Sequence, residues 1–158
     1  MKFYFLLLIF LTTAAFSQHN VEMFSSTLKS LTPDEVKGYV EGSGMGQAKV
    51  AELNGYPGPM HLLERKDELK LTSEQVRSLE ELKTRMTTEA IKYGTDVIEA
   101  EKQLNKLFAG GNATEEQVRG AVVKSEESKA NVRYAHLKAH LASRRILTPS
   151  QLKAYYAR

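Results

Sequence analysis

The feature that most constrains this sequence is a run of apolar and small residues, spaced alternately by three and four, across residues 72–108. The run consists of Leu79, Leu82, Met86, Ala90, Tyr93, Val97, Ala100, Leu104 and Leu107. Steps of three and four place side chains on one face of an α-helix, whereas a strand alternates every second residue. The segment is therefore predicted to form one amphipathic helix, roughly 50 Å long at 1.5 Å per residue.

A second helix is predicted from about residue 115 to 144, after a break at Gly110-Gly111-Asn112. Its apolar face is made of small residues, namely Val118, Ala121, Ser125, Ser128, Val132, Ala135, Ala139 and Ala142. A large-residue face, a small-residue face and a short turn predict an antiparallel hairpin with closely spaced axes. Because two helices alone bury little surface, we expect short flanking helices, a second copy of the chain, or both to cover the hairpin.

Four segments share a pattern that starts a helix: a threonine N-cap with Glu or Gln three residues later, which together form a capping box. They are Leu31–Val36, Leu71–Val76, Ala113–Val118 and Leu147–Leu152. Two of them carry proline at the first helical position, where no amide hydrogen is needed. Helices are therefore expected at 33–44 and 149–157, with a shorter one at 59–68. The Gly/Pro-containing residues 42–58 are expected to form a bent connection, with a helical patch at 47–53.

The N-terminus resembles a secretory leader, with Lys2 before an apolar run at Phe3–Leu11 and small residues at Ala15 and Ser17. About nine apolar residues are too few to span a bilayer, which needs about twenty. We therefore expect a signal peptide at 1–17, a flexible leader at 18–30, one helical domain at 31–158, and no stable membrane insertion after cleavage. The chain has no cysteine, so its stability must come from packing.

Composition and motifs argue against two function classes. The formal net charge of +3 is too small to indicate a nucleic-acid-binding protein. The sequence has no G-x-S-x-G or H-E-x-x-H motif, and no glycine loop follows a predicted strand. We therefore predict that the protein is not an enzyme and requires no cofactor.

Two pairs of residues have the helical spacing of metal ligands, His61 with Glu64 and His136 with His140. Symmetry about the Gly110–Asn112 turn brings the second pair opposite Leu82 and Met86, at the open end of the hairpin, which His61 also reaches. These four residues could bind zinc, copper or nickel, with Met45, Met60 or Met86 as thioether donors suited to copper(I). The alternative is that His136 and His140 are half-buried interface residues.

Two of the helix starts also carry a family resemblance. Leu71, Thr72 and Gln75, and likewise Leu147, Thr148 and Gln151, resemble the paired LTxxQ motifs of the Spy/CpxP family of periplasmic proteins. The resemblance extends to the leader, the hairpin between the motifs and the chain length. The segments 51–61 and 134–141 are similar to a branch described as chaperones or heavy-metal sensors.

The resemblance implies a periplasmic, cradle-shaped homodimer that shields unfolded or misfolded envelope proteins without ATP, as a chaperone or envelope-stress adaptor. The alternative implied function is heavy-metal binding, resistance or sensing. Unlike the sensors, the sequence lacks a His-x-x-x-His pair on its first helix. Tyrosines and cations of the last helix could contact clients or pack a dimer: Lys153, Tyr155, Tyr156 and Arg158.

Overall fold

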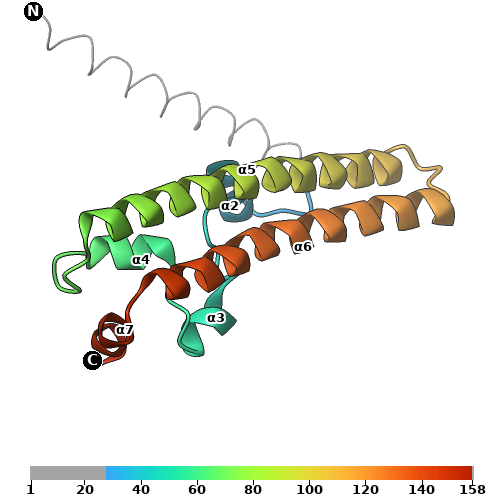
Figure 1. Ribbon diagram of the computed structural model, residues 1–158. Helices are drawn as coiled ribbons and strands as arrows, with labels where there is room; N and C mark the ends of the chain where they lie inside the picture. The colour runs from blue at the N-terminus through green and yellow to red at the C-terminus, as the bar shows by residue number, and fades with distance from the viewer. Residues whose placement is uncertain (1–27, 158) are drawn as a thin grey trace, which may run out of the picture.

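The computed structural model describes residues 28–157, which form helices and turns without any strand. Two long helices, α5 (Ser73–Ala109) and α6 (Glu115–Ile146), lie side by side along the molecule (Figure 1). Shorter flanking helices complete this part of the chain: α2 (Pro33–Glu41), α3 (Lys49–Leu53), α4 (Pro59–Glu64) and α7 (Pro149–Tyr156). The predicted all-α hairpin with short flanking helices is confirmed. The homodimer and the signal peptide at 1–17, which lies outside the described residues, stay predictions.

The four predicted capping boxes are all present. In each, the threonine side chain accepts a hydrogen bond from the backbone N–H three residues later, and the side chain at that position accepts from the threonine N–H. These boxes start α2, α5, α6 and α7 at the predicted residues, because each satisfies two amide groups that a helix leaves without an internal partner. None of the helices in residues 28–157 is long and apolar enough to cross a membrane.

Two helices end earlier than the sequence predicts. The first, α2, stops at Glu41 because Gly42 adopts a left-handed conformation, with φ of 66°. An added Cβ at Gly42 would lie 2.9 Å from the Thr87 carbonyl oxygen, so this turn also brings the chain close to α5. The helix α4 ends at Glu64 and continues as a turn through residue 70.

A first core cluster forms where α2 crosses the middle of the hairpin. It consists of Leu28, Leu31, Val36, Tyr39, Val97, Ile98 and Val132. The crossing is close because Gly94 has no side chain: a Cβ there would lie 2.5 Å from the Tyr39 carbonyl oxygen. Burying each of these large apolar side chains stabilises the fold by about 1.5–3 kcal/mol. The short helix α2 therefore supplies cover that the two long helices lack.

A buried carboxylate ties the start of the described chain to the hairpin. Glu101 accepts hydrogen bonds from Ser125 at 2.6 Å and from Ser30 at 2.7 Å. Its carboxylate also lies 3.2 Å from the Lys129 ammonium. Leu28 is buried in the first cluster. The prediction of a flexible leader is therefore wrong for residues 28–30, which are held by these contacts, whereas residues 18–27 lie outside the described part.

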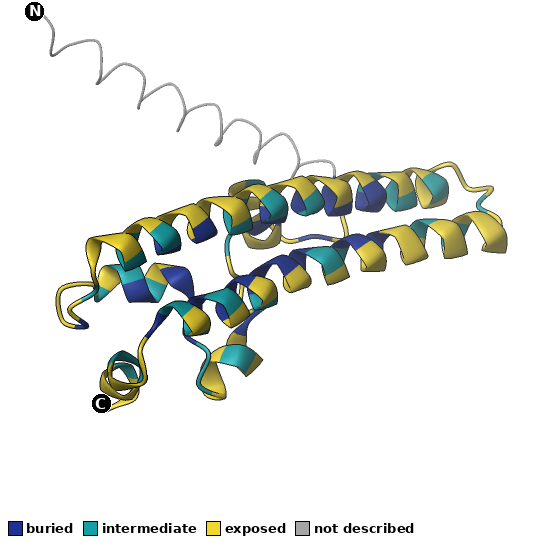
Figure 2. Cartoon of the chain, viewed as in Figure 1, coloured by how far each residue is buried: buried dark blue, intermediate teal, exposed yellow. Residues whose placement is uncertain are grey.

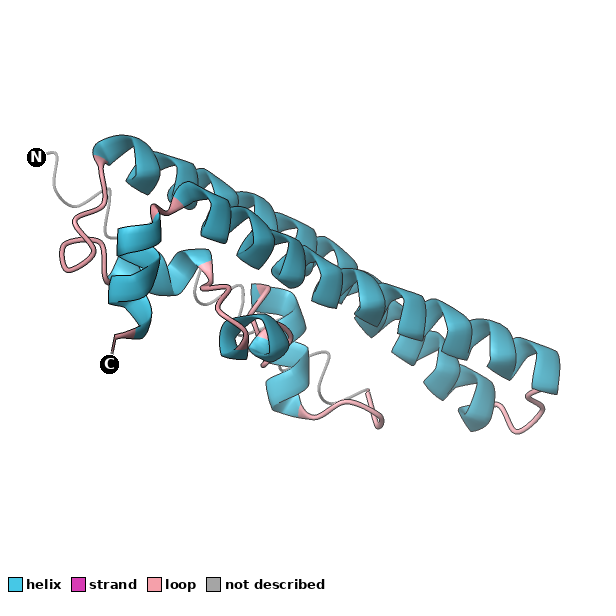
Figure 3. Cartoon of the chain, turned by 60° about the horizontal axis from the view of Figure 1, so that its bottom comes forward, coloured by secondary structure: helices cyan, strands magenta, loops and turns pink. Residues whose placement is uncertain are grey.

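A second core cluster closes the open end of the hairpin, where α4, α5 and α7 meet. Its buried members are Leu62, Leu69, Leu79 and Leu147, and Leu71, Leu152 and Tyr155 pack against them. Figure 2 shows the buried residues along the facing sides of the long helices, while the end near the α5–α6 turn is largely exposed. Viewed from below, the short helices lie on one side of the hairpin (Figure 3).

Candidate functional site

The predicted ligands meet at a cavity between the 42–61 segment and the two long helices. The cavity measures about 620 Å³ and is lined by His61, His136 and His140, together with the three methionines Met45, Met60 and Met86. The helices α5 and α6 bring residues from opposite arms of the hairpin to it, as the symmetry about the Gly110–Asn112 turn predicts. The structure thus gathers three of the four predicted ligands and all three predicted thioethers.

His140 is oriented by the connection that passes over it. Its Nδ1 lies 2.8 Å from the carbonyl oxygen of Tyr56. A carbonyl can only accept, so Nδ1 carries a hydrogen, and in the neutral ring the lone pair is on Nε2. Nε2 lies 3.9 Å from a carboxylate oxygen of Glu52. Gly58 makes room for the ring, since a Cβ there would lie 2.8 Å from Nε2.

The same connection is held by the residue one turn further along α6. The Arg144 guanidinium donates to the Gly55 carbonyl and stacks 4.7 Å from the centre of the Tyr56 ring. Tyr56 is thereby fixed by a cation–π contact as well as by its bond to His140. The backbone at Gly55 and Tyr56 is therefore held in place where it contacts His140.

His136 lies one turn before His140 and is 3% exposed. Its Nε2 is the buried side-chain nitrogen or oxygen in residues 28–157 that has no hydrogen-bond partner. Burial, and secondarily the charge of His140, lower the pKa of His136, although a backbone hydrogen bond with Ser43 partly offsets this. The ring is therefore neutral near pH 7 and has a lone pair available. The prediction that these two histidines are half-buried is wrong, because the 42–58 connection covers both of them.

His61 lines the cavity but faces a different partner. Its Nδ1 lies 3.0 Å from a carboxylate oxygen of Glu64, with both side chains about half exposed. Glu64 is not among the residues that line the cavity, so the structure does not bring it to His136 and His140. Within the described chain, no group of three or more histidine, aspartate or glutamate side chains is placed to hold a metal ion.

The charges around the cavity partly balance. The carboxylates Glu41 and Glu52 line it, and so does the cation Lys83. The acidic pair favours a bound cation, whereas the ammonium of Lys83 opposes it. Since Lys83 is exposed, its charge is screened by water more than that of a group beside the buried histidines would be.

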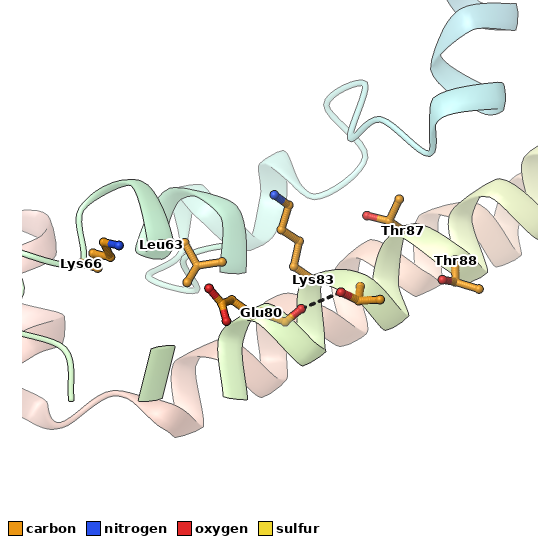
Figure 4. A pocket seen from close by; sticks show the side chains of 7 residues that line it. Leu63, Lys66, Glu80, Lys83, Thr87 and Thr88 are labelled. Atoms are coloured by element: carbon orange, nitrogen blue, oxygen red, sulfur yellow. Dashed lines mark hydrogen bonds between the residues drawn. The ribbon is translucent and has the colours of Figure 1, made fainter. Parts of the chain in front are cut away.

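A second, more open hollow adjoins the first between α4 and α5. It measures about 550 Å³, and Lys83 and Thr87 line both spaces. Figure 4 shows Leu63 and Lys66 on one side and Glu80, Lys83, Thr87 and Thr88 on α5. The Thr84 hydroxyl donates to the Glu80 carbonyl at 2.9 Å, so it is satisfied within its own helix. The lining residues of this hollow include no histidine, cysteine or methionine, so it is not a candidate for the metal site.

The predicted client-contact residues on α7 divide between core and surface. Tyr155 packs against the second core cluster, and the Arg65 guanidinium stacks 4.6 Å from the centre of its ring. Lys153 and Tyr156 are exposed. Arg158 lies outside the described residues. Tyr155 is thus already engaged within its own chain, which leaves Lys153 and Tyr156 as the exposed surface of this group.

Four residues of the site were not predicted from the sequence: Ser43, Glu52, Tyr56 and Gly58. Three of them act through backbone groups or through the lack of a side chain, for which sequence spacing carries no signal. Glu52 lies on the short helix α3, and its position opposite His140 depends on the path of the whole connection. Comparison with protein-family models, curated proteins and solved structures found no match. The Spy/CpxP resemblance therefore rests on the motif residues themselves.

Proposed function

We propose that this protein binds a transition-metal ion through His136 and His140. The observation that carries the proposal is the buried Nε2 of His136, which has no hydrogen-bond partner. Leaving such a group unsatisfied costs about 1–3 kcal/mol, which a fold tolerates where a ligand compensates. His140 lines the same cavity, and in its neutral form with a hydrogen on Nδ1 its lone pair is on Nε2.

The surroundings of the two rings support this proposal. Histidines that bind metal commonly donate their other ring N–H to a carbonyl or carboxylate, which fixes the tautomer and the ring orientation. The Tyr56 carbonyl does this for His140. Burial keeps His136 neutral, as ligation requires.

The test is calorimetric titration of the full chain with zinc, nickel and copper, followed by thermal melting of each mixture. We expect a site that His136→Gln and His140→Gln remove, and a melting temperature that rises with metal excess in the parent. The matched control is His61→Gln, because that ring is about half exposed and paired with Glu64. Metal binding that survives both α6 substitutions would refute the proposal.

A second proposed function is ATP-independent chaperoning of unfolded envelope proteins, as the resemblance implies. It is favoured by exposed apolar side chains on the hairpin, namely Phe108, Val122, Val123, Tyr134 and Leu141. Scattered apolar contacts with neighbouring charges allow weak and promiscuous association. Both proposals include export to the periplasm, which rests on the N-terminal residues and on the resemblance.

Chaperone activity is tested by suppression of aggregation of an unrelated unfolding protein, without nucleotide. We expect Phe108→Ser with Val123→Ser to reduce suppression, since both side chains are more than half exposed. Tyr156→Ser, on α7, tests the predicted client surface there. Failure of the parent chain at several-fold molar excess would exclude this function.

A further inference from the structure

We infer that the metal ion is copper(I), bound by the Nε2 atoms of His136 and His140 and by the thioethers of Met60 and Met86. This inference rests on the proposed metal-binding function and adds the chemical class of the ion. It follows from the imidazole and thioether donors that line the cavity, and from the lack of a third grouped histidine or carboxylate ligand in the described residues.

The nitrogen and oxygen donors are too few for zinc. Structural zinc sites use four protein ligands and catalytic ones use three. Within the part of the chain that the structure describes, no three histidine or carboxylate side chains are grouped to hold a metal. His61, the third histidine of the cavity, is paired with Glu64 outside it. Copper(I) accepts lower coordination numbers than zinc, so two imidazoles with soft donors suit it.

The soft donors are concentrated at this one place. Every methionine in residues 28–157 lines this cavity, on three different segments of the chain: Met45, Met60 and Met86. Methionine in a core usually fills an irregular gap between apolar side chains. Here Met60 is 46% exposed, so gap filling does not account for it. Thioethers are neutral, soft ligands that select copper(I) over harder ions.

The three thioethers are not equivalent. The sulfur of Met45 is folded over α2, where a Cβ at Gly38 would lie only 2.1 Å from it. Met45 therefore packs against Gly38 and is not assigned as a ligand. Its substitution is the control for the other two methionines. Met86 lies on α5, which faces the two histidines across the hairpin, and Met60 precedes His61 at the cavity edge. These two are the sulfur donors of the inferred site.

The charge at the site also suits a monovalent ion. Two neutral imidazoles and two thioethers leave the full charge of the ion uncompensated, and Glu52 lies 3.9 Å from Nε2 of His140. The carboxylates Glu41 and Glu52 and the ammonium of Lys83 together give the cavity lining a formal net charge of −1, which balances a single positive charge. A divalent ion would retain an uncompensated charge beside the buried ring of His136.

The experiment is an anaerobic competition between the full chain and a chromogenic copper(I) chelator, run in parallel with a zinc indicator. We expect the parent to take one copper(I) per chain. Met60→Leu with Met86→Leu, which conserves volume, is expected to weaken copper(I) binding by about tenfold or more while leaving zinc binding unchanged. Met45→Leu is the matched control and is expected to leave copper(I) affinity within about twofold.

X-ray absorption of the copper-loaded parent provides a second measurement that does not depend on a variant folding. Sulfur in the coordination shell is expected, and nitrogen and oxygen alone would overturn the inference. Zinc or nickel binding that requires His136 and His140, without copper(I) uptake, would also overturn it while leaving the proposed function intact. No metal binding of any kind, or binding indifferent to both histidines, would overturn the proposed function as well.

Discussion

The Nε2 of Gln75 lies 2.8 Å from Oε1 of Gln151, so the third residues of two helices are joined directly by their side-chain amides. The Gln75 amide also donates to the Ile146 carbonyl at 2.8 Å. Each glutamine additionally accepts from its own N-cap threonine through the capping box. The two motifs that resemble each other in sequence therefore form one tertiary contact, which closes the open end of the hairpin and links α5 to α7.

This contact predicts unequal effects for chemically identical substitutions. Gln75→Ala is expected to lower the free energy of unfolding by about 1–3 kcal/mol, because it leaves the part-buried Ile146 carbonyl and Gln151 amide without this partner. Gln117→Ala is the control, since Gln117 is exposed and its side chain accepts only within the capping box of α6. Denaturant unfolding measures both. Equal losses would show that the Gln75 side chain acts only as a cap.

A glycine comparison tests the close crossing of α2 over α5. Gly94→Ala is expected to destabilise the fold by about 1–3 kcal/mol, because the Tyr39 backbone would have to move away from the new methyl group. Gly120→Ala, in α6 with nothing within 4 Å of its Cβ position, is expected to stabilise by about 1 kcal/mol. Thermal melting of the two variants should therefore shift in opposite directions. A neutral Gly94→Ala would contradict the crossing.

The Glu101 carboxylate predicts a loss of stability in acid. Burial raises its pKa, but hydrogen bonds from Ser125, Ser30 and Lys129 lower it more, so the folded-state pKa lies below the usual value of 4.5. The unfolded chain then binds the proton first as the pH falls. The contribution of this group is complete above about pH 4.5 and is lost as the pH falls through the lowered folded-state value.

Replacing Glu101 with glutamine provides the test of that contribution. At pH 7, Glu101→Gln is expected to cost about 1–3 kcal/mol, because the Lys129 ammonium loses its buried partner. The difference between parent and variant should shrink as urea unfolding is repeated at pH 5, 4 and 3. The exposed Glu126, which also pairs with Lys129, serves as the control when changed to glutamine. A difference that stays constant with pH would contradict the assignment.

The last prediction concerns the glycine that touches His140. In Gly58→Ala, the added methyl group is expected to displace the ring, because its Cβ position is 2.8 Å from Nε2. Metal affinity should fall by about tenfold, and the melting temperature of the metal-free chain should also fall, because the displaced ring loses its bond to the Tyr56 carbonyl. Gly44→Ala is the control, since Gly44 lines the same cavity with nothing within 4 Å of its Cβ position. Titration calorimetry and melting measure both effects.

Local signals were enough to predict the elements of this fold. The capping boxes at Thr32, Thr72, Thr114 and Thr148 fix where four helices begin, because they involve only residues three apart. The apolar period of residues 72–108 and the break at Gly110 to Asn112 then predict the hairpin. From the antiparallel arrangement it also follows that His136 and His140 lie near Met86, as the cavity shows.

Only the tertiary structure decided which groups the histidines face. The bond from His140 to the Tyr56 carbonyl spans 84 residues and involves a backbone atom, so residue identity does not reveal it. The burial of Glu101 and the exclusion of Glu64 from the cavity likewise depend on the paths of α2 and α4 across the hairpin. Sequence alone determined the helices and their order, because those depend on neighbours along the chain. The Nε2 of His136 is buried without a hydrogen-bond partner because segments far apart in sequence pack around its ring.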